Sequence, residues 1–148
     1  MKLRIDFCII RKKEVNMKID NVPQQVIDLM TADKFVAFCG ITLDEIGPGY
    51  ARTYITIDER HLNGAGIIQG GVLFTLADYA LAAASNSREK ISVSIETSMS
   101  FIKGISSGRV YAVAQEVSCG KSLARYDVPV TTEDGKLIAL LHGTVFRK

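Results

Sequence analysis

A carboxylate and a pair of glycines in one apolar segment are the groups through which this 148-residue chain could do chemistry. The segment, residues 70–85, is rich in Ala and Leu, which are strong helix formers. Its apolar residues are distributed around the whole circumference of the helix and not along one stripe. We therefore expect a helix that other structure encloses on nearly every side. Asp78 lies midway along it, where an ionised group is costly unless it is paired or used. Asp78 is thus the first candidate for a functional residue.

Gly70 and Gly71 open the same helix and add a second kind of chemical group. The first turn of a helix has free backbone N–H groups and a partial positive charge, and glycine lets a ligand approach that backbone closely. Such N–H groups can stabilise a carbonyl oxygen as it becomes an oxyanion. The alternative is that the two glycines only pack the helix start against a sheet, and the residues alone leave both interpretations open.

The spacing between these groups predicts a dimer if both are catalytic. Eight residues separate Gly70 from Asp78, which corresponds to about 12 Å along a helix axis. One chain therefore cannot bring both groups to one small substrate atom. A two-fold partner with an antiparallel helix would place its Asp78 opposite this Gly70. The other interpretation of Asp78 is a buried acid that bonds hydroxyls such as that of Ser94.

The surrounding elements follow from periodicity and turn residues. Asn21 and Pro23 start an amphipathic helix that ends near Cys39-Gly40, and two strands flank the turn at 47–49. From Ile91 onward a meander of four strands without intervening helices predicts a largely antiparallel sheet. The predicted fold class is α+β, with a curved sheet of five to six strands wrapped round one long central helix. The expected strands are residues 41–46, 50–57, 91–102, 110–118, 123–130 and 137–146.

Length and composition predict one domain, residues 17–148, preceded by an extension, residues 1–16, with Met17 as an alternative start. The formal charge of +2 and the absence of Trp argue against nucleic-acid binding. No segment has the roughly 20 apolar residues that span a membrane. Cys8, Cys39 and Cys119 form no Cys-x-x-Cys pair, so we expect small core residues without a disulfide or zinc, in a reducing cytoplasm.

Other motifs are weaker. Gly64-x-Gly66 follows a strand and precedes a helix, but Gly70 falls one residue late for a dinucleotide-binding fingerprint and crossover helices are lacking. His61 and His142 belong to no metal-binding or Ser-His-Asp pattern, so we expect each to be structural and expect no metal.

Residues 61–78 resemble the signature of the hotdog-fold acyl-CoA thioesterases of the phenylacetic-acid-degradation type (PaaI-like). In that family an Asn, a Gly-Gly helix start and a helix Asp recur at this spacing. The resemblance extends from about residue 22 to the C-terminus. It implies hydrolysis of an acyl-CoA to free acid and coenzyme A, without metal or cofactor, by a homodimer that pairs into a homotetramer.

The resemblance also implies roles for single residues. The Gly70 N–H would polarise the thioester carbonyl, Asn63 would orient water or substrate, and Asp78 of the neighbouring subunit would be the general base or nucleophile. Ser94 matches a serine that helps to place the water in some relatives. Gln69 stands where many relatives have His, and since Gln cannot hold a proton for transfer, only a positional or carbonyl-binding role remains.

Contacts with coenzyme A are implied at two loops. Gly120-Lys121-Ser122 matches a turn that lies near the pantetheine and nucleotide in relatives, and Gly71 accompanies Gly70 at the helix start. Lys103 and Arg109 flank a turn and could meet phosphates, although exposed cations are commonly just solvated.

Two other functions remain open. Gln69 keeps open the alternative of a non-catalytic protein that binds or senses acyl-CoA, and a hotdog dehydratase or hydratase is the third hypothesis. Acyl-chain preference is expected to depend on the space beside Phe74, Tyr79 and Phe101.

Overall fold

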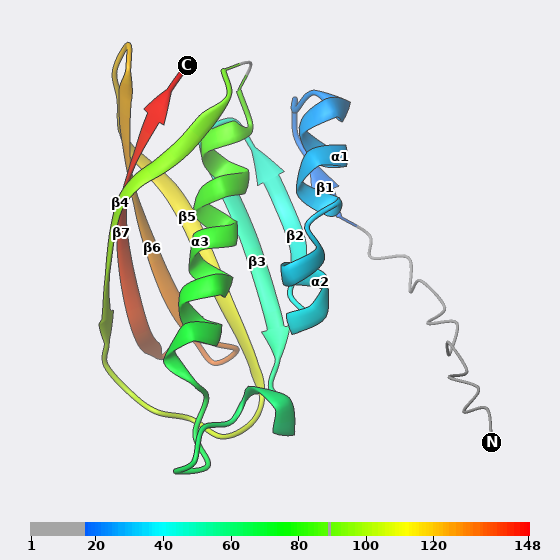
Figure 1. The fold of residues 1–148 in the computed structure, drawn as a ribbon, viewed down its shortest axis with the longest axis vertical. Helices are drawn as coiled ribbons and strands as arrows, with labels where there is room; N and C mark the ends of the chain where they lie inside the picture. Colours follow the sequence, from blue (N-terminus) through cyan, green and yellow to red (C-terminus); the bar gives the residue numbers. More distant parts are fainter. Residues whose placement is uncertain (1–16, 89) are drawn as a thin grey trace, which may run out of the picture.

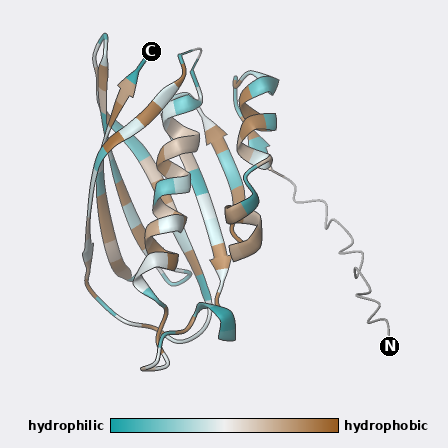
Figure 2. Ribbon diagram, in the orientation of Figure 1, coloured by the Kyte–Doolittle hydropathy of each residue, from teal (hydrophilic) through white to brown (hydrophobic). Residues whose placement is uncertain are grey.

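The computed structural model describes residues 17–88 and 90–148, so the predicted extension at 1–16 lies outside the described residues. One long helix, α3 (Gly70–Asn86), lies in the hollow of a curved sheet, with two short helices beside it (Figure 1). Buried apolar residues of α3 and of the strands around it form the core, and apolar positions recur along both in Figure 2. The predicted α+β hotdog architecture, a curved, largely antiparallel sheet round one central helix, is confirmed.

The described part of the sheet has seven strands, in the order β1-β2-β3-β5-β6-β7-β4. Every pairing is antiparallel except that of β1 with β2. The expected count of five to six missed β1, because a two-residue strand has no periodicity to detect. The strands are β1 (Lys18–Ile19), β2 (Thr42–Gly47), β3 (Tyr50–Thr56), β4 (Ser92–Phe101), β5 (Arg109–Cys119), β6 (Leu123–Thr132) and β7 (Leu137–Arg147).

The position of β4 differs from the predicted four-strand meander. β5, β6 and β7 do form a meander, but β4 pairs with β7 at the edge of the sheet and has no pairing with β5. The connection at residues 102–108 crosses below the start of α3, so β4 and β3 flank opposite sides of the helix (Figure 1). This crossing lets the sheet curl round α3 and leaves β4 as an open edge.

Close contact between α3 and the sheet depends on small residues. Ala77, Ala80 and Ala84 are completely buried. Gly143 of β7 lies under Leu81, so close that a Cβ on this glycine would be 2.5 Å from Leu81 Cδ2. The hydroxyl of buried Thr53 on β3 donates to the Leu76 carbonyl oxygen at 2.9 Å, so a polar bond ties the helix to the sheet within the core.

The single helix expected between Asn21 and Gly40 is wrong, because two helices occupy this stretch: α1 (Gln24–Thr31) and α2 (Lys34–Cys39). Asp33 starts the second helix by accepting a hydrogen bond from the Val36 N–H at 2.9 Å, which is the preferred use of Asp at a helix N-terminus. The helix end was predicted correctly: Gly40 closes α2 at a φ of 74°.

Helix α3 is less enclosed than its composition predicted. Gly71 is exposed and Thr75, Asp78 and Ala82 are half-buried. These positions are three or four residues apart, so they form one stripe on the helix. None of the described helices is long and apolar enough to cross a membrane.

We predict that Gly143→Ala lowers the free energy of unfolding by about 1–3 kcal/mol, because an added methyl group overpacks the buried contact with Leu81. Gly64→Ala is the matched control, since nothing lies within 4 Å of its added Cβ. Chemical denaturation at equal protein concentration measures both. Equal stability of the two variants would contradict the close packing of α3 on β7.

Candidate active site

The start of α3 is capped by the residue that precedes the two glycines. Gln69 Oε1 accepts hydrogen bonds from the Gly71 N–H and from the Val72 N–H, the latter at 3.2 Å. The Gly70 N–H, in contrast, has no acceptor among residues 17–88 and 90–148. Of the two glycines predicted to act here, Gly70 therefore has the free donor, while the Gly71 N–H is occupied. The cap could have been predicted from the sequence, because Gln69 immediately precedes the helix.

The loop before α3 is held from both ends. The His61 ring is buried, with Nδ1 accepting from the Asp58 N–H at 2.9 Å and Nε2 lying 2.8 Å from the Cys39 carbonyl oxygen. Asn63 Oδ1 accepts from the Ala65 N–H at 2.9 Å and closes the turn. Both ring nitrogens of His61 serve the backbone, which agrees with the structural role expected for this histidine.

A pocket of about 270 Å³ opens beside the free Gly70 N–H. Asn63 and Lys103, both predicted site residues, lie on its wall together with Gly70. The remaining wall is apolar and was not predicted as a group, apart from Phe101. Its apolar members are Ile67, Ile68, Leu73, Phe101 and Ile102.

Asp78 lies two helical turns from this pocket, on the half-buried stripe of α3. Burial raises the pKa of its carboxyl group, and the negative charge of Asp33 at the start of α2 raises it further. Sequence patterns gave no signal that Asp33 affects the pKa of Asp78, because the break between α1 and α2 is what brings Asp33 near Asp78. The predicted alternative, a hydrogen bond to Ser94, is not formed: Ser94 is exposed on β4.

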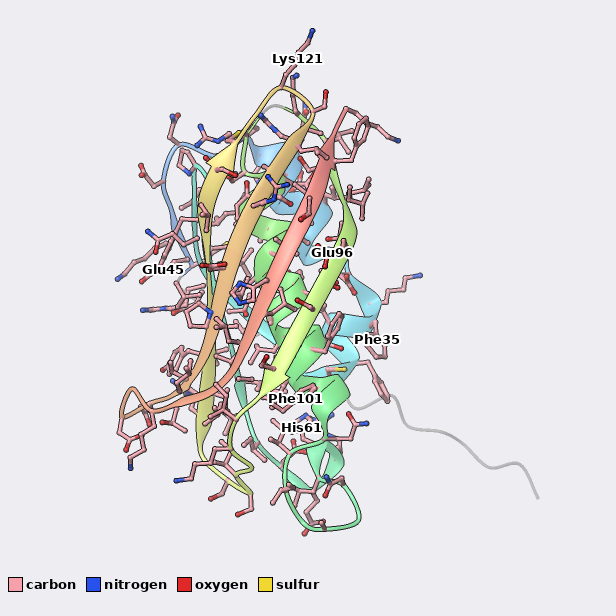
Figure 3. The ribbon with its side chains drawn as sticks, turned by 90° about the vertical axis from the view of Figure 1, so that its left-hand side faces the viewer. Phe35, Glu45, His61, Glu96, Phe101 and Lys121 are labelled. Carbon is pink, nitrogen blue, oxygen red and sulfur yellow. The ribbon has the colours of Figure 1, made fainter. Side chains whose placement is uncertain are left out.

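The residues predicted to bind coenzyme A lie at opposite ends of the sheet. Lys103 lies at the Gly70 pocket, whereas Lys121 is at the far end of the sheet from Phe101 and His61 (Figure 3). Arg109 does not line the pocket; its guanidinium carbon lies 4.7 Å from the centre of the Tyr54 ring. Within one protomer these groups therefore cannot hold one ligand together.

A larger cavity of about 680 Å³ is connected to the turn at Gly120-Lys121-Ser122 through Arg147. Arg88, Lys90 and Arg147 line this cavity, and Arg147 Nη1 donates to the Gly120 carbonyl oxygen at 2.7 Å. The cavity is basic but lies far from Gly70, so it cannot be the place of catalysis in the same protomer.

The other titratable candidates do not join the site. His142 is exposed and lies 2.7 Å from Asp127. Cys119 is exposed, so its expected role as a core residue is wrong, whereas Cys39 is half-buried and packs against the core. Among the described residues no group of three His, Cys, Asp or Glu side chains is arranged to hold a metal ion.

Comparison with known proteins agrees with this fold. The family model of the thioesterase superfamily matches residues 65–139. A protein of Archaeoglobus fulgidus is 36% identical over 143 residues, which cover 95% of this chain and 89% of that protein. The acyl-coenzyme A thioesterase PaaI of Escherichia coli K12 is 32% identical over 109 residues, 73% of this chain and 78% of PaaI.

Solved structures show the same likeness in three dimensions. A mutant of the phenylacetic acid degradation protein PaaI from Thermus thermophilus is 38% identical, with a TM-score of 0.75 over 78% of this chain and 100% of that one. The E. coli PaaI structure has a TM-score of 0.80 at 28% identity, over 84% of this chain and 91% of its own. The chain therefore belongs to the thioesterase superfamily, as a hotdog-fold protein of the PaaI-like type.

Proposed function

We propose that the protein is an acyl-CoA thioesterase that hydrolyses an acyl-CoA to the free acid and coenzyme A. The observation that carries this proposal is that Gly70, whose N–H has no acceptor among the described residues, lines a largely apolar pocket at the positive end of α3. A thioester carbonyl oxygen gains negative charge when its carbon is attacked. A fixed N–H donor at that point stabilises the transition state more than the ground state.

Asp78 is the proposed base. Its carboxylate takes a proton from water while the oxygen of that water adds to the thioester carbon. The tetrahedral intermediate then collapses, the carbon–sulfur bond breaks, and the departing thiolate takes up the proton. The raised pKa of Asp78 suits this role, because a base with a pKa nearer to neutral accepts and returns a proton more readily.

The two groups would meet across a dimer, since they are about 12 Å apart along one helix. Strand β4 supports this arrangement: it is an open edge of ten residues, with Val93 44% and Ile95 56% exposed. Exposed apolar edge strands favour pairing with another strand. Antiparallel pairing of two β4 strands would continue the sheet and turn the two α3 helices antiparallel, so that Asp78 of each faces Gly70 of the other.

The same two-fold arrangement would unite the expected contacts with coenzyme A. It would bring the far end of the partner, with its Gly120-Lys121-Ser122 turn and basic cavity, toward the Gly70 end of this protomer. Lys103 would then lie on one side of the ligand and the partner's Lys121 on the other. We keep Arg109 as a weaker candidate, and we propose that two such dimers form the homotetramer.

Replacing Asp78 should separate activity from stability. We predict that Asp78→Asn lowers kcat for acyl-CoA hydrolysis by about 10²- to 10⁴-fold, the usual value of general-base catalysis. The variant should nevertheless be more stable at pH 7. Folding raises the pKa of Asp78 above its unfolded value of 3.8, so the folded state favours the protonated form and the carboxylate costs stability above that raised pKa. Below pH 3.8 both states are protonated and the gain should vanish.

Thiol release from short, medium, long and aromatic acyl-CoAs, with denaturation curves at pH 7 and pH 3.5, measures both effects. Light scattering checks that wild type and variant assemble equally. Full hydrolysis by a correctly assembled Asp78→Asn variant would remove this residue from the mechanism. If the wild type binds acyl-CoA but releases no thiol, the protein is a binding or sensing protein.

The pH profile tests whether Asp78 titrates as the base. We predict that kcat/KM rises with pH along a limb above the ordinary carboxyl pKa, and that Asp33→Asn moves this limb to lower pH because it removes the nearby negative charge. Asn is an equally good helix cap, so α2 should persist. Asp28→Asn on α1 is the control substitution. An acid limb that is unchanged in Asp33→Asn would contradict the assignment.

We expect Gln69 to affect activity only by holding the start of α3 in position, and not by transferring a proton. We predict that Gln69→Ala costs about 1 kcal/mol of stability and lowers kcat by about 10- to 10²-fold, because the helix start that aims the Gly70 N–H becomes less fixed. Gln69→His should retain activity, since its ring nitrogen can replace the acceptor. Steady-state kinetics across pH measure this. A new titrating limb in Gln69→His would instead indicate proton transfer at this position.

A further inference from the structure

Phe101 lies at the mouth of the Gly70 pocket. It is the last residue of the edge strand β4 and lines the pocket, yet 57% of it is exposed. A Cβ on Gly70 would lie 3.1 Å from Phe101 Cζ and 3.2 Å from Cε1, so the ring covers the glycine directly. The labelled side chain is seen beside the start of α3 in Figure 3.

The backbone around the ring is held, whereas the ring itself is not enclosed. The Ile102 and Lys103 N–H groups both donate to the Ile138 carbonyl oxygen, at 2.9 and 3.1 Å. The Ile68 N–H donates to the Ile105 carbonyl oxygen at 2.8 Å and joins the two loops that form the pocket. Within one protomer, a well-placed Cα with a largely exposed ring leaves more than one side-chain rotamer accessible.

Other parts of the pocket lining are closely packed. Leu73 is buried within the core. A Cβ on Gly104 would lie 2.7 Å from Ile67 Cδ1, which leaves no space between these two loops. Ile67 and Ile102 of the lining are also exposed, but Phe101 is its largest apolar side chain and the one that lies directly over Gly70.

The other aromatic residues expected beside the acyl group do not line this pocket. Tyr79 is buried, and its hydroxyl donates to the Met30 carbonyl oxygen at 2.8 Å. Phe74 is half-buried and packs against the core. Of the three aromatic candidates, only Phe101 borders the pocket at Gly70.

We infer that Phe101 is the specificity-determining residue of the site, and that the position of its ring sets the longest apolar acyl group that fits beside the Gly70 N–H. This inference rests on the proposed function for its substrate class. The ring forms the movable wall of the pocket, the acyl chain lies against it, and the ring also shields Gly70 from water. Coenzyme A itself has no acyl group and does not depend on this wall.

The test is the dependence of hydrolysis on acyl length. In the wild type, kcat/KM rises as methylene groups are added and falls at the first chain that no longer fits. Phe101→Ala should raise kcat/KM for that chain by about tenfold or more, because a single methylene group is worth at least that much in an apolar pocket. Phe101→Trp should lower kcat/KM for the longest chain that the wild type accepts. Inhibition by free coenzyme A should be unchanged in both variants.

Phe38→Ala is the matched control, because Phe38 is 74% exposed on α2 and does not line the pocket. Light scattering confirms equal assembly. The variants are repeated in the Asp78→Asn background, where calorimetry gives Kd against acyl length without hydrolysis. This separates the two proposals. If Phe101→Ala shifts the dependence of Kd on acyl length but the wild type hydrolyses no acyl-CoA, the role of Phe101 stands and only the proposed thioesterase activity is refuted.

Three results would overturn the role of Phe101. The first is the same dependence of kcat/KM on acyl length in Phe101→Ala and wild type. The second is a change in inhibition by free coenzyme A as large as the change in kcat/KM, and the third is no binding of any acyl-CoA.

Discussion

The close packing of α3 into the curved sheet is the constraint on which the rest of the structure depends. The helix presents mainly alanines to the strands, and β7 presents Gly143 where Leu81 enters. This approach buries the helix without bulky partners and fixes its axis relative to both walls of the sheet. Because the helix is fixed by this packing, its first residue and its midpoint, which carry the two proposed catalytic groups, are also held in place.

The start of α3 shows how a structural need and a chemical one are met together. A helix leaves its first N–H groups without partners, and the Gln69 side chain satisfies two of them. The donor that remains, Gly70, is the one that borders the pocket. The Gln69 side chain thus determines which N–H remains free, even though it cannot transfer a proton.

Asp78 carries a cost to stability that its proposed role explains. A half-buried carboxylate near a second one at Asp33 is disfavoured in its charged form. A core built for stability alone would place a neutral residue there. Active sites commonly retain such groups because the same surroundings that destabilise the charge adjust its basicity. In the proposed dimer, a second copy would cover both the half-buried stripe on α3 and the open edge of β4.

The sequence by itself determined the central helix, the two strands before it, the hairpins after it, and the motif at 61–78, because each depends on local periodicity or on turn residues. It did not determine that β4 pairs with β7, that α1 and α2 are separate, or that Asp33 lies close enough to raise the pKa of Asp78. These features depend on contacts between residues distant in the chain, for which period and propensity carry no signal. The pocket wall around Phe101 is a further case, since it exists only where the end of β4 crosses the start of α3.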